Sequence, residues 1–344
     1  MACPRLRVLE ELILLEICAF IGSVRKFEGE MRELKIFGWV ALLALSFPCA
    51  VVAQEDEEVP PEGNGQSSTS DSVNRHIAWL GDPNEHTRRN AAAGLANFGP
   101  GAKEAVSELI LALSDRDDAD LRKYAARALG AIGPDAHQAV PALRRALSDR
   151  SDFGSRFVRK ESATALGRIG PKAAGVVVDD LLPLLGDDDL YVRRAASEAL
   201  ALLQTSAIPG LIKTLGHPEP EVRYRASAAL AEMRGASLEA LETALESPDV
   251  LVRRAAARAL ASYHVAQQLR AVPRLIKGMQ DSDSEVRNWA VLALVERAAE
   301  SDEAMAAILD ELRKDSELAF EIVVQLSRVA SREIVLRKLL AIIS

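Results

Sequence analysis

Few residues in the chain have the type and spacing that catalysis requires. No two histidines stand at the His-x-x-x-His spacing with which one helix face holds a metal ion. We expect a turn or surface role for each of the five, which are His76, His86, His137, His217 and His264. The cysteines are Cys3, Cys18 and Cys49, and neither a Gly-x-Ser-x-Gly motif nor a phosphate-binding glycine loop occurs. The sequence therefore predicts no catalytic residue, no metal ligand and no cofactor.

Acidic turns leave one alternative open. Asp115, Asp117, Asp118 and Asp120 cluster, as do residues 187–189, and calcium prefers oxygen ligands of this kind. The glycine and the final glutamate of an EF-hand loop are absent. Capping of helix N-termini explains these aspartates more simply, so we favour capping over a weak calcium site.

The strongest signal is an arginine that returns at a nearly constant interval. Around it the chain reads small apolar residue, Arg, two variable residues, Ala-Ala or Ala-Ser, then Ala-Leu, as in Val222 to Leu230. The spacings are 34, 37, 34, 30, 30 and 34 residues between Arg88, Arg122, Arg159, Arg193, Arg223, Arg253 and Arg287. This period is typical of a solenoid, whose short units bury their apolar faces against one another.

Each unit is predicted to be an antiparallel pair of helices. Val222, Ala226 and Leu230 recur at helical spacing and share one face. A first helix precedes each copy, as at 139–147 and 271–279. Gly-Pro pairs at 99–100, 133–134 and 170–171 end one helix and start the next, and Asp-rich turns at 187–189 and 281–283 supply N-caps for the second helix.

A second cation directly follows the repeated arginine in five copies. These second cations are Arg89, Lys123, Lys160, Arg194 and Arg254. Stacking of the repeats would align them into a stripe that could bind an acidic peptide, a phosphate or an anionic polysaccharide. For the repeated arginines themselves we favour an internal ladder, in which each pairs with a turn carboxylate six or seven residues earlier, among them Asp82, Asp115, Asp152, Asp187 and Asp281.

Three aromatic residues lie one or two positions after the repeated arginine. Tyr124, Tyr224 and Trp289 fall where the second helix begins. Aromatic residues and arginines are the usual anchors of interfaces. Packing into the core or a groove wall is the alternative, and the sequence does not decide between the two.

These features resemble HEAT repeats, specifically the short variety named after the phycobilisome lyases. The resemblance covers about residues 75 to 300 and rests on Pro141, Pro209 and Pro273 in the middle of first helices, an Asp in the turn and the Val-Arg pair opening the second helix. It implies an all-α superhelix, a HEAT-type solenoid of about seven to eight helix pairs. Ser107 and Asp179 depart from it by replacing the proline.

The uneven spacing predicts local irregularities. The two 30-residue steps lose four residues each, about one helical turn, and predict shortened first helices between Arg193 and Arg253. The 37-residue step adds three residues near 151–155, which we place in a protruding turn.

The chain divides into five predicted segments. Residues 1–30 precede a second Met and indicate a mis-assigned start. Residues 31–53 resemble a signal peptide with cleavage after Ala53, the alternative being an uncleaved membrane anchor over 36–53. Residues 54–72 are predicted to be a disordered acidic linker, residues 73–300 the repeats, and residues 301–344 a degenerate helical cap with helices at 302–313, 316–328 and 331–343.

The predicted function is that of a non-enzymatic, exported scaffold. Of 344 residues, 49% are hydrophobic, which excludes a disordered chain, and the net charge of −8 disfavours a nucleic-acid partner. We expect an extracytoplasmic location, periplasmic or secreted, and an unknown protein or peptide partner, with an acidic surface if the stripe binds it. The alternatives are a membrane-anchored scaffold and a lyase-like or metal-assisted enzyme on the same repeats. The His-Glu pairs of one related enzyme family, deoxyhypusine hydroxylase, do not occur.

Overall fold

A computed structural model describes residues 69–262 and 269–313, together with Leu318, Ile322 and Gln325. All of them belong to one compact unit, Gln66–Ser344. Every regular element in these residues is helical, so the predicted all-α solenoid is confirmed. The leader, the linker up to residue 68, His264 and the two last predicted helices lie outside the described residues, apart from the three single positions named above.

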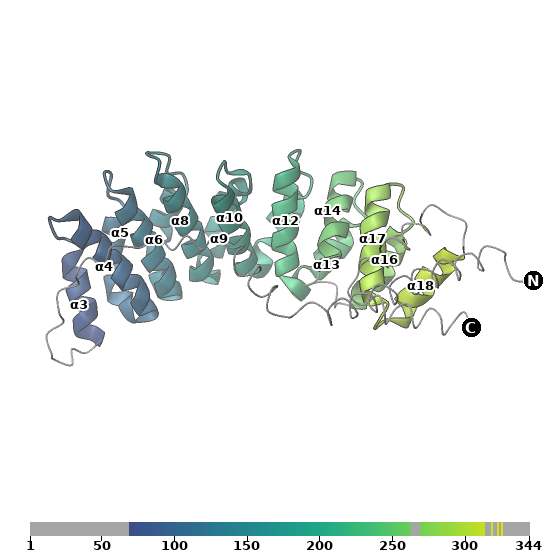
Figure 1. Ribbon diagram of the computed structural model, residues 1–344, viewed down its shortest axis with the longest axis horizontal. Coiled ribbons are helices and arrows are strands. Elements are labelled where there is room, and N and C mark those ends of the chain that lie inside the picture. The colour runs from purple at the N-terminus through teal and green to yellow at the C-terminus, as the bar shows by residue number, and fades with distance from the viewer. Residues whose placement is uncertain (1–68, 263–268, 314–317, 319–321, 323–324, 326–344) are drawn as a thin grey trace, which may run out of the picture. The chain divides into compact units, whose positions relative to one another are not determined.

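The helices alternate between a first and a second helix of each repeat (Figure 1). The first helices are α3 (Thr69–Trp79), α5 (Val106–Ala112), α7 (Val140–Ala146), α9 (Pro171–Leu181), α11 (Ile208–Thr214), α13 (Leu238–Ala244) and α16 (Val272–Gly278). The second helices are α4 (Glu85–Phe98), α6 (Ala119–Ile132), α8 (Ser155–Ile169), α10 (Leu190–Leu202), α12 (Pro220–Glu232), α14 (Val250–Leu260) and α17 (Ser284–Arg297). Helix α18 (Asp302–Leu312) follows them.

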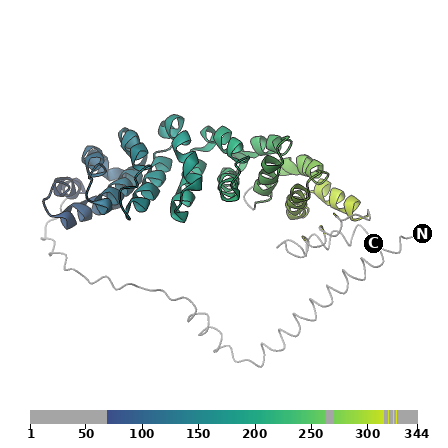
Figure 2. The same cartoon turned by 90° about the horizontal axis from the view of Figure 1, so that it is seen from above.

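Each second helix packs against the second helices of the adjacent repeats, from α4 through α17. The first helices form a second row beside them (Figure 2). The contact face is the one the periodicity predicts, because Val222 is 4% exposed and Ala226 and Leu230 are fully buried. Small alanines at these positions let the helices approach closely.

Two glycines mark the closest approaches between second helices. A Cβ on Gly130 of α6 would lie 2.9 Å from the Cα of Ala165 in α8, and one on Gly167 of α8 would lie 2.7 Å from the Cα of Ala199 in α10. Real Cβ atoms do not approach a backbone carbon that closely. Glycine is therefore required at both crossings.

The predicted capping residues take their expected places. Asp189 accepts hydrogen bonds from the first backbone N–H groups of α10, and Asp283 does the same for α17. Gly99, Gly133 and Gly170 end their helices with positive φ angles of 53°, 73° and 75°, which glycine adopts without strain.

The prolines stand elsewhere than predicted. Pro141, Pro209 and Pro273 occupy the first turn of their helices rather than the middle. The residues before them form 3-10 turns, and a proline in the first helical turn removes no hydrogen bond. Pro100 and Pro134 likewise begin 3-10 helices, η1 (Gly99–Ala105) and η2 (Gly133–Ala139).

The shortened repeats lose residues from these 3-10 connections and not from the first helices. Helices α11 and α13 have the same seven residues as α5 and α7, whereas η4 (Gln204–Ser206) and η5 (Arg234–Ala236) have three residues where η1 and η2 have seven. The prediction of shortened first helices was therefore wrong. Gln204 and Arg234 replace the glycine of the longer repeats and keep a positive φ of 53°, a conformation that strains a residue with a side chain.

The predicted end of the linker and the predicted protruding turn can be compared with the structure. Helix α3 begins at Thr69, so the last four residues of the predicted 54–72 linker are helical. Residues 151–154 form a turn before α8, where Phe153 is 80% exposed.

None of the described helices is long and apolar enough to cross a membrane.

Candidate functional site

The repeated arginines, here called the ladder arginines (Arg88, Arg122, Arg159, Arg193, Arg223, Arg253 and Arg287), all turn back toward the start of their own helix. In each, Nη1 donates to backbone carbonyls of the preceding turn. Arg193, for example, reaches the carbonyl oxygen of Asp187 at 2.7 Å. The aspartate is thus contacted through its backbone, and the predicted pairing with its carboxylate is corrected.

Where a ladder arginine has a carboxylate partner, that carboxylate comes from the next repeat. Arg159 holds Asp187 with two hydrogen bonds of 3.0 and 2.8 Å, and Arg253 holds Asp281 at 2.8 and 3.1 Å. Arg122 reaches Asp149 at 2.9 Å and Asp152 at 2.8 Å. Each of these three arginines therefore ties its own turn to the following one, a contact that spacing within one repeat does not reveal. For Arg88 and Arg287 the described hydrogen bonds go to backbone carbonyls only.

This ladder is interrupted in the middle of the array. The positions that match Asp187 and Asp281 hold His217 and Ser247 in the two short repeats, which offer no carboxylate. The Nε of Arg193 is buried without a hydrogen bond, and its nearest carboxylate oxygen, on Glu221, is 3.7 Å away. Arg223 has backbone contacts only, among those described.

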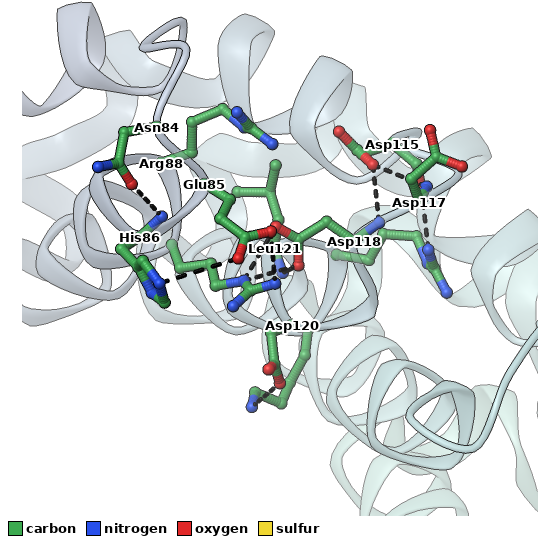
Figure 3. A network of polar contacts seen from close by, with 12 residues as sticks. Asn84, Glu85, His86, Arg88, Asp115, Asp117, Asp118, Asp120 and Leu121 are labelled. Carbon is green, nitrogen blue, oxygen red and sulfur yellow. Dashed lines mark hydrogen bonds and ion pairs between the residues drawn. The ribbon is translucent and has the colours of Figure 1, made fainter.

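The second cations, here called the column cations (Arg89, Lys123, Lys160, Arg194 and Arg254), are already paired. Arg89 contacts Asp118 at 2.9 Å across the junction. Asp118 also caps α6 by accepting from the N–H of Leu121 (Figure 3). Arg254 likewise holds Asp283, the cap of α17, at 2.6 Å. The other three pair within their own helices, with Asp120, Glu161 and Glu198.

Several of these pairs shift the pKa of one or both members. Arg254 holds the pKa of Asp283 below its usual value, and Lys123 does the same to the pKa of Asp120. The pKa of Arg89 rises because Asp118 accepts its hydrogen bond. The expected free positive stripe is therefore a neutralised, mixed-charge surface.

The predicted aromatic residues divide into two groups. Tyr124 and Trp289 are half-buried against the core, whereas Tyr224 is 37% exposed. Sequence reasoning missed two exposed aromatics that stand two residues before a ladder arginine, Phe157 (38%) and Tyr191 (63%). Comparing the residue two positions before the arginine in each repeat would have identified them.

The pattern of helix pairs, capped turns and ladder arginines matches a known repeat. HEAT repeats match the chain in overlapping segments at residues 73–157, 106–201, 154–216, 178–261, 208–295 and 238–325. Together these segments span most of the chain. The protein belongs to the HEAT-repeat family.

Two solved structures are similar to this HEAT protein. An engineered protein shares 27% identity and a TM-score of 0.39, covering 75% of this chain and 78% of its own. The complex of CpcE and CpcF of phycocyanin lyase from Nostoc sp. PCC7120 shares 28% identity and a TM-score of 0.39, covering 73% of this chain and 96% of its own. No curated protein matches the chain.

The acidic turns of the HEAT array are occupied by its own donors. Asp115 accepts from the backbone N–H groups of Asp117 and Asp118, and Asp189 from those of α10. In the part of the chain that the structure describes, no three acidic, histidine or cysteine side chains converge as metal ligands would. Asp115 and Asp189 therefore act as acceptors for the backbone of their own turns and helices.

A shallow hollow of about 860 Å³ lies on the first helices of the short repeats. Ile208, Pro209 and Ile212 of α11 form one side, and Ala240 of α13 and Val252 of α14 belong to the other. Its charged lining residues are Glu239 and Glu246, and Glu246 is paired with Arg274 and Lys277 at 2.6 and 2.8 Å. It therefore offers an apolar surface without a nucleophile paired to a base.

Proposed function

We propose that the protein is a non-enzymatic HEAT scaffold that binds a protein or peptide along the exposed face of its second helices. The observation that carries the proposal is the series of outward-facing aromatic residues on that face. Phe157, Tyr191 and Tyr224 are exposed on α8, α10 and α12, at or near the first turn of each helix. Exposed aromatic side chains supply much of the binding energy of protein interfaces.

The charges on the same face favour a peptide over a simple polyanion. Because every column cation already has a carboxylate partner, an anionic polymer would have to displace these partners. Ion pairs at the rim of an interface contribute to register and specificity more than to affinity. Aromatic residues surrounded by paired charges are the usual composition of such a surface.

Site-specific photocrosslinking tests the binding face. A photoreactive phenylalanine analogue would replace Tyr191 on a second helix, or Leu111, which is 73% exposed on the first helix α5, as the matched control. We expect the full-length protein in its native host to crosslink a partner from position 191 and not from 111, with the crosslinked peptide identified by mass spectrometry. Crosslinks from 111 alone, or equal yields from both positions, would contradict the proposed face.

We also propose that residues 31–53 direct export and are removed. The support is the basic start at Met31-Arg32, the apolar run from Ile36 and the small residue Ala53 before an acidic segment. N-terminal sequencing of the native protein is expected to begin at Gln54. A chain that retains residues 36–53 would indicate a membrane-anchored scaffold instead.

A further inference from the structure

One exposed arginine on the second helices lies beside aromatic rings from both neighbouring repeats. Arg258 of α14 is exposed, and its guanidinium carbon lies 4.3 Å from the ring centre of Tyr224 in α12 and 5.5 Å from that of Trp289 in α17. The three residues come from three consecutive repeats whose second helices pack together. The stacking of repeats therefore places this guanidinium beside one aromatic ring from each neighbouring repeat.

The positive charge of Arg258 is not paired with a carboxylate among the described residues. Arg225, whose guanidinium carbon lies 5.2 Å from the ring centre of Tyr224, is paired with Glu221 at 2.9 Å. No described acidic side chain lies within ion-pair distance of Arg258, whereas each column cation has one. Its N–H groups are therefore available to an acceptor from outside.

We propose that Tyr224, Arg258 and Trp289 form an anchor site for an acidic side chain of a partner peptide. The planar fork of arginine matches a carboxylate in two parallel hydrogen bonds, and contact with two rings holds that fork in a fixed orientation. An apolar residue next to the acidic one would cover the exposed ring of Tyr224. A bare inorganic anion would use the guanidinium alone and leave the rings without a contact, which is why a peptide fits better.

This inference rests on the proposed function and specifies one of its contacts. The probe is a library of random twelve-residue peptides displayed on phage and selected on the immobilised full-length protein. We expect the selected peptides to be enriched in Asp or Glu beside an apolar residue. The best peptide is then synthesised with Glu, Gln or phosphoserine at the acidic position, and its dissociation constant is measured by calorimetry.

The variants separate this site from the rest of the face. Arg258→Ala is compared with Arg127→Ala, because Arg127 also stands five residues after a ladder arginine, is exposed and has no ring contact among the described residues. We expect Arg258→Ala to weaken the Glu peptide about tenfold or more, as a lost charged hydrogen bond does, and Arg127→Ala to leave it unchanged. Replacing Glu by Gln in the peptide should weaken its binding to the unaltered protein by the same factor. The Arg258→Ala variant should bind the Glu and Gln peptides equally well, because the contact is already lost.

Several results would overturn the site. Equal binding by Arg258→Ala and the unaltered protein, or independent effects of Arg258→Ala and Glu→Gln, would place the acidic contact elsewhere while leaving the scaffold function intact. Tighter binding of the phosphoserine peptide by more than tenfold would make the site a phosphate reader. If the folded, unaltered protein selects no peptide at all, the proposed function fails together with the site.

Discussion

Arg159 illustrates how a single side chain joins two HEAT repeats. Its Nη1 donates to the carbonyl oxygen of Asp149 in its own turn, and its Nε and Nη2 donate to Asp187 in the next. Arg159 is 4% exposed and the Asp187 side chain is fully buried. A buried charge is tolerated because its partner and its hydrogen bonds are both in place. The ladder arginine is therefore a connection between units, and its loss should be felt at the junction.

We expect Arg159→Ala to lower the free energy of unfolding by roughly 3 kcal/mol, since it leaves a buried carboxylate with one remaining cation, Arg150. Arg223→Ala is the matched control, because Arg223 makes backbone contacts alone among those described, and should cost about 1 kcal/mol. Urea denaturation followed by circular dichroism measures both. Equal losses would show that the carboxylate from the next repeat contributes little.

Acid should weaken the junctions through the same carboxylates. Burial alone would raise the pKa of Asp187, but hydrogen bonds from Arg159 and from the N–H of Asp189 outweigh it, so the pKa lies below its ordinary value of 3.8. As the pH falls, the unfolded chain takes up its proton first. The stability due to Asp187 is therefore complete above the ordinary pKa and is lost as the pH falls through the lowered one.

The pH dependence can be checked with Asp187→Asn. We expect the unaltered protein to lose stability steeply below about pH 4, and the variant to be less stable at pH 7 with a shallower loss in acid. Unfolding free energies measured between pH 7 and pH 3 would show the two curves converging. Parallel curves would mean that Asp187 does not contribute to the acid sensitivity.

Helix packing depends on small residues at the crossings of the second helices. Gly130 and Gly167 stand in α6 and α8 at the same place relative to their ladder arginines, and each faces the backbone of the next second helix. Alanine is a better helix former than glycine, so glycine at these places lowers the propensity of the helix itself. Close approach of neighbouring helices outweighs that loss, because it buries the alanine-rich faces on both.

Gly167→Ala should destabilise the protein by about 1 to 3 kcal/mol, as overpacking of a close contact does. Gly175→Ala is a control in α9 with open space around the added Cβ, and should be neutral or slightly stabilising. Thermal denaturation of both variants distinguishes packing from propensity. A stable Gly167→Ala variant would show that α8 and α10 can move apart at no cost.

Across the whole array, the junctions are not equally strong. Carboxylates join α6 to the turn before α8, α8 to the turn before α10, and α14 to the turn before α17, through Arg122, Arg159 and Arg253. The short repeats lack such a carboxylate at His217 and Ser247, and the 3-10 turn that opens each of them holds a strained residue with positive φ, Gln204 or Arg234. Because repeat arrays are stabilised by nearest-neighbour interfaces, the α10–α12–α14 region is expected to open first.

The ladder can be completed with His217→Asp and Ser247→Asp. Each should give a carboxylate to Arg193 or Arg223 and stabilise the array by about 1 kcal/mol, and hydrogen exchange should slow in α10, α12 and α14. Asp at position 217 also keeps a turn acceptor, since His217 Nδ1 now accepts from the N–H of Glu219. As a control, Asp82→Asn alters a turn residue at the start of the array, far from these junctions. Unchanged exchange in the double variant would contradict the weak-junction interpretation.

Helix pairs, their capping residues and the HEAT family could all be predicted from the sequence. These follow from periodicity and turn chemistry within one repeat, as with Asp189 and Asp283, because helix formation and capping depend on neighbours a few residues away. The burial of Ala226 and Leu230 was predictable for the same reason. The local signals and the tertiary fold agree.

Tertiary structure alone decided what each charged side chain contacts. Ladder arginines and column cations look alike in sequence, yet Arg159 and Arg254 reach carboxylates 28 and 29 residues away, and Arg258 lies between rings from two other repeats. Such contacts depend on the rise and rotation from one repeat to the next, which no spacing within a repeat encodes. From the sequence, the four residues missing from each short repeat were assigned to the first helix, whereas they are missing from the 3-10 turn before it. A residue count does not distinguish the two, because a 3-10 turn and a helix differ in their hydrogen bonding.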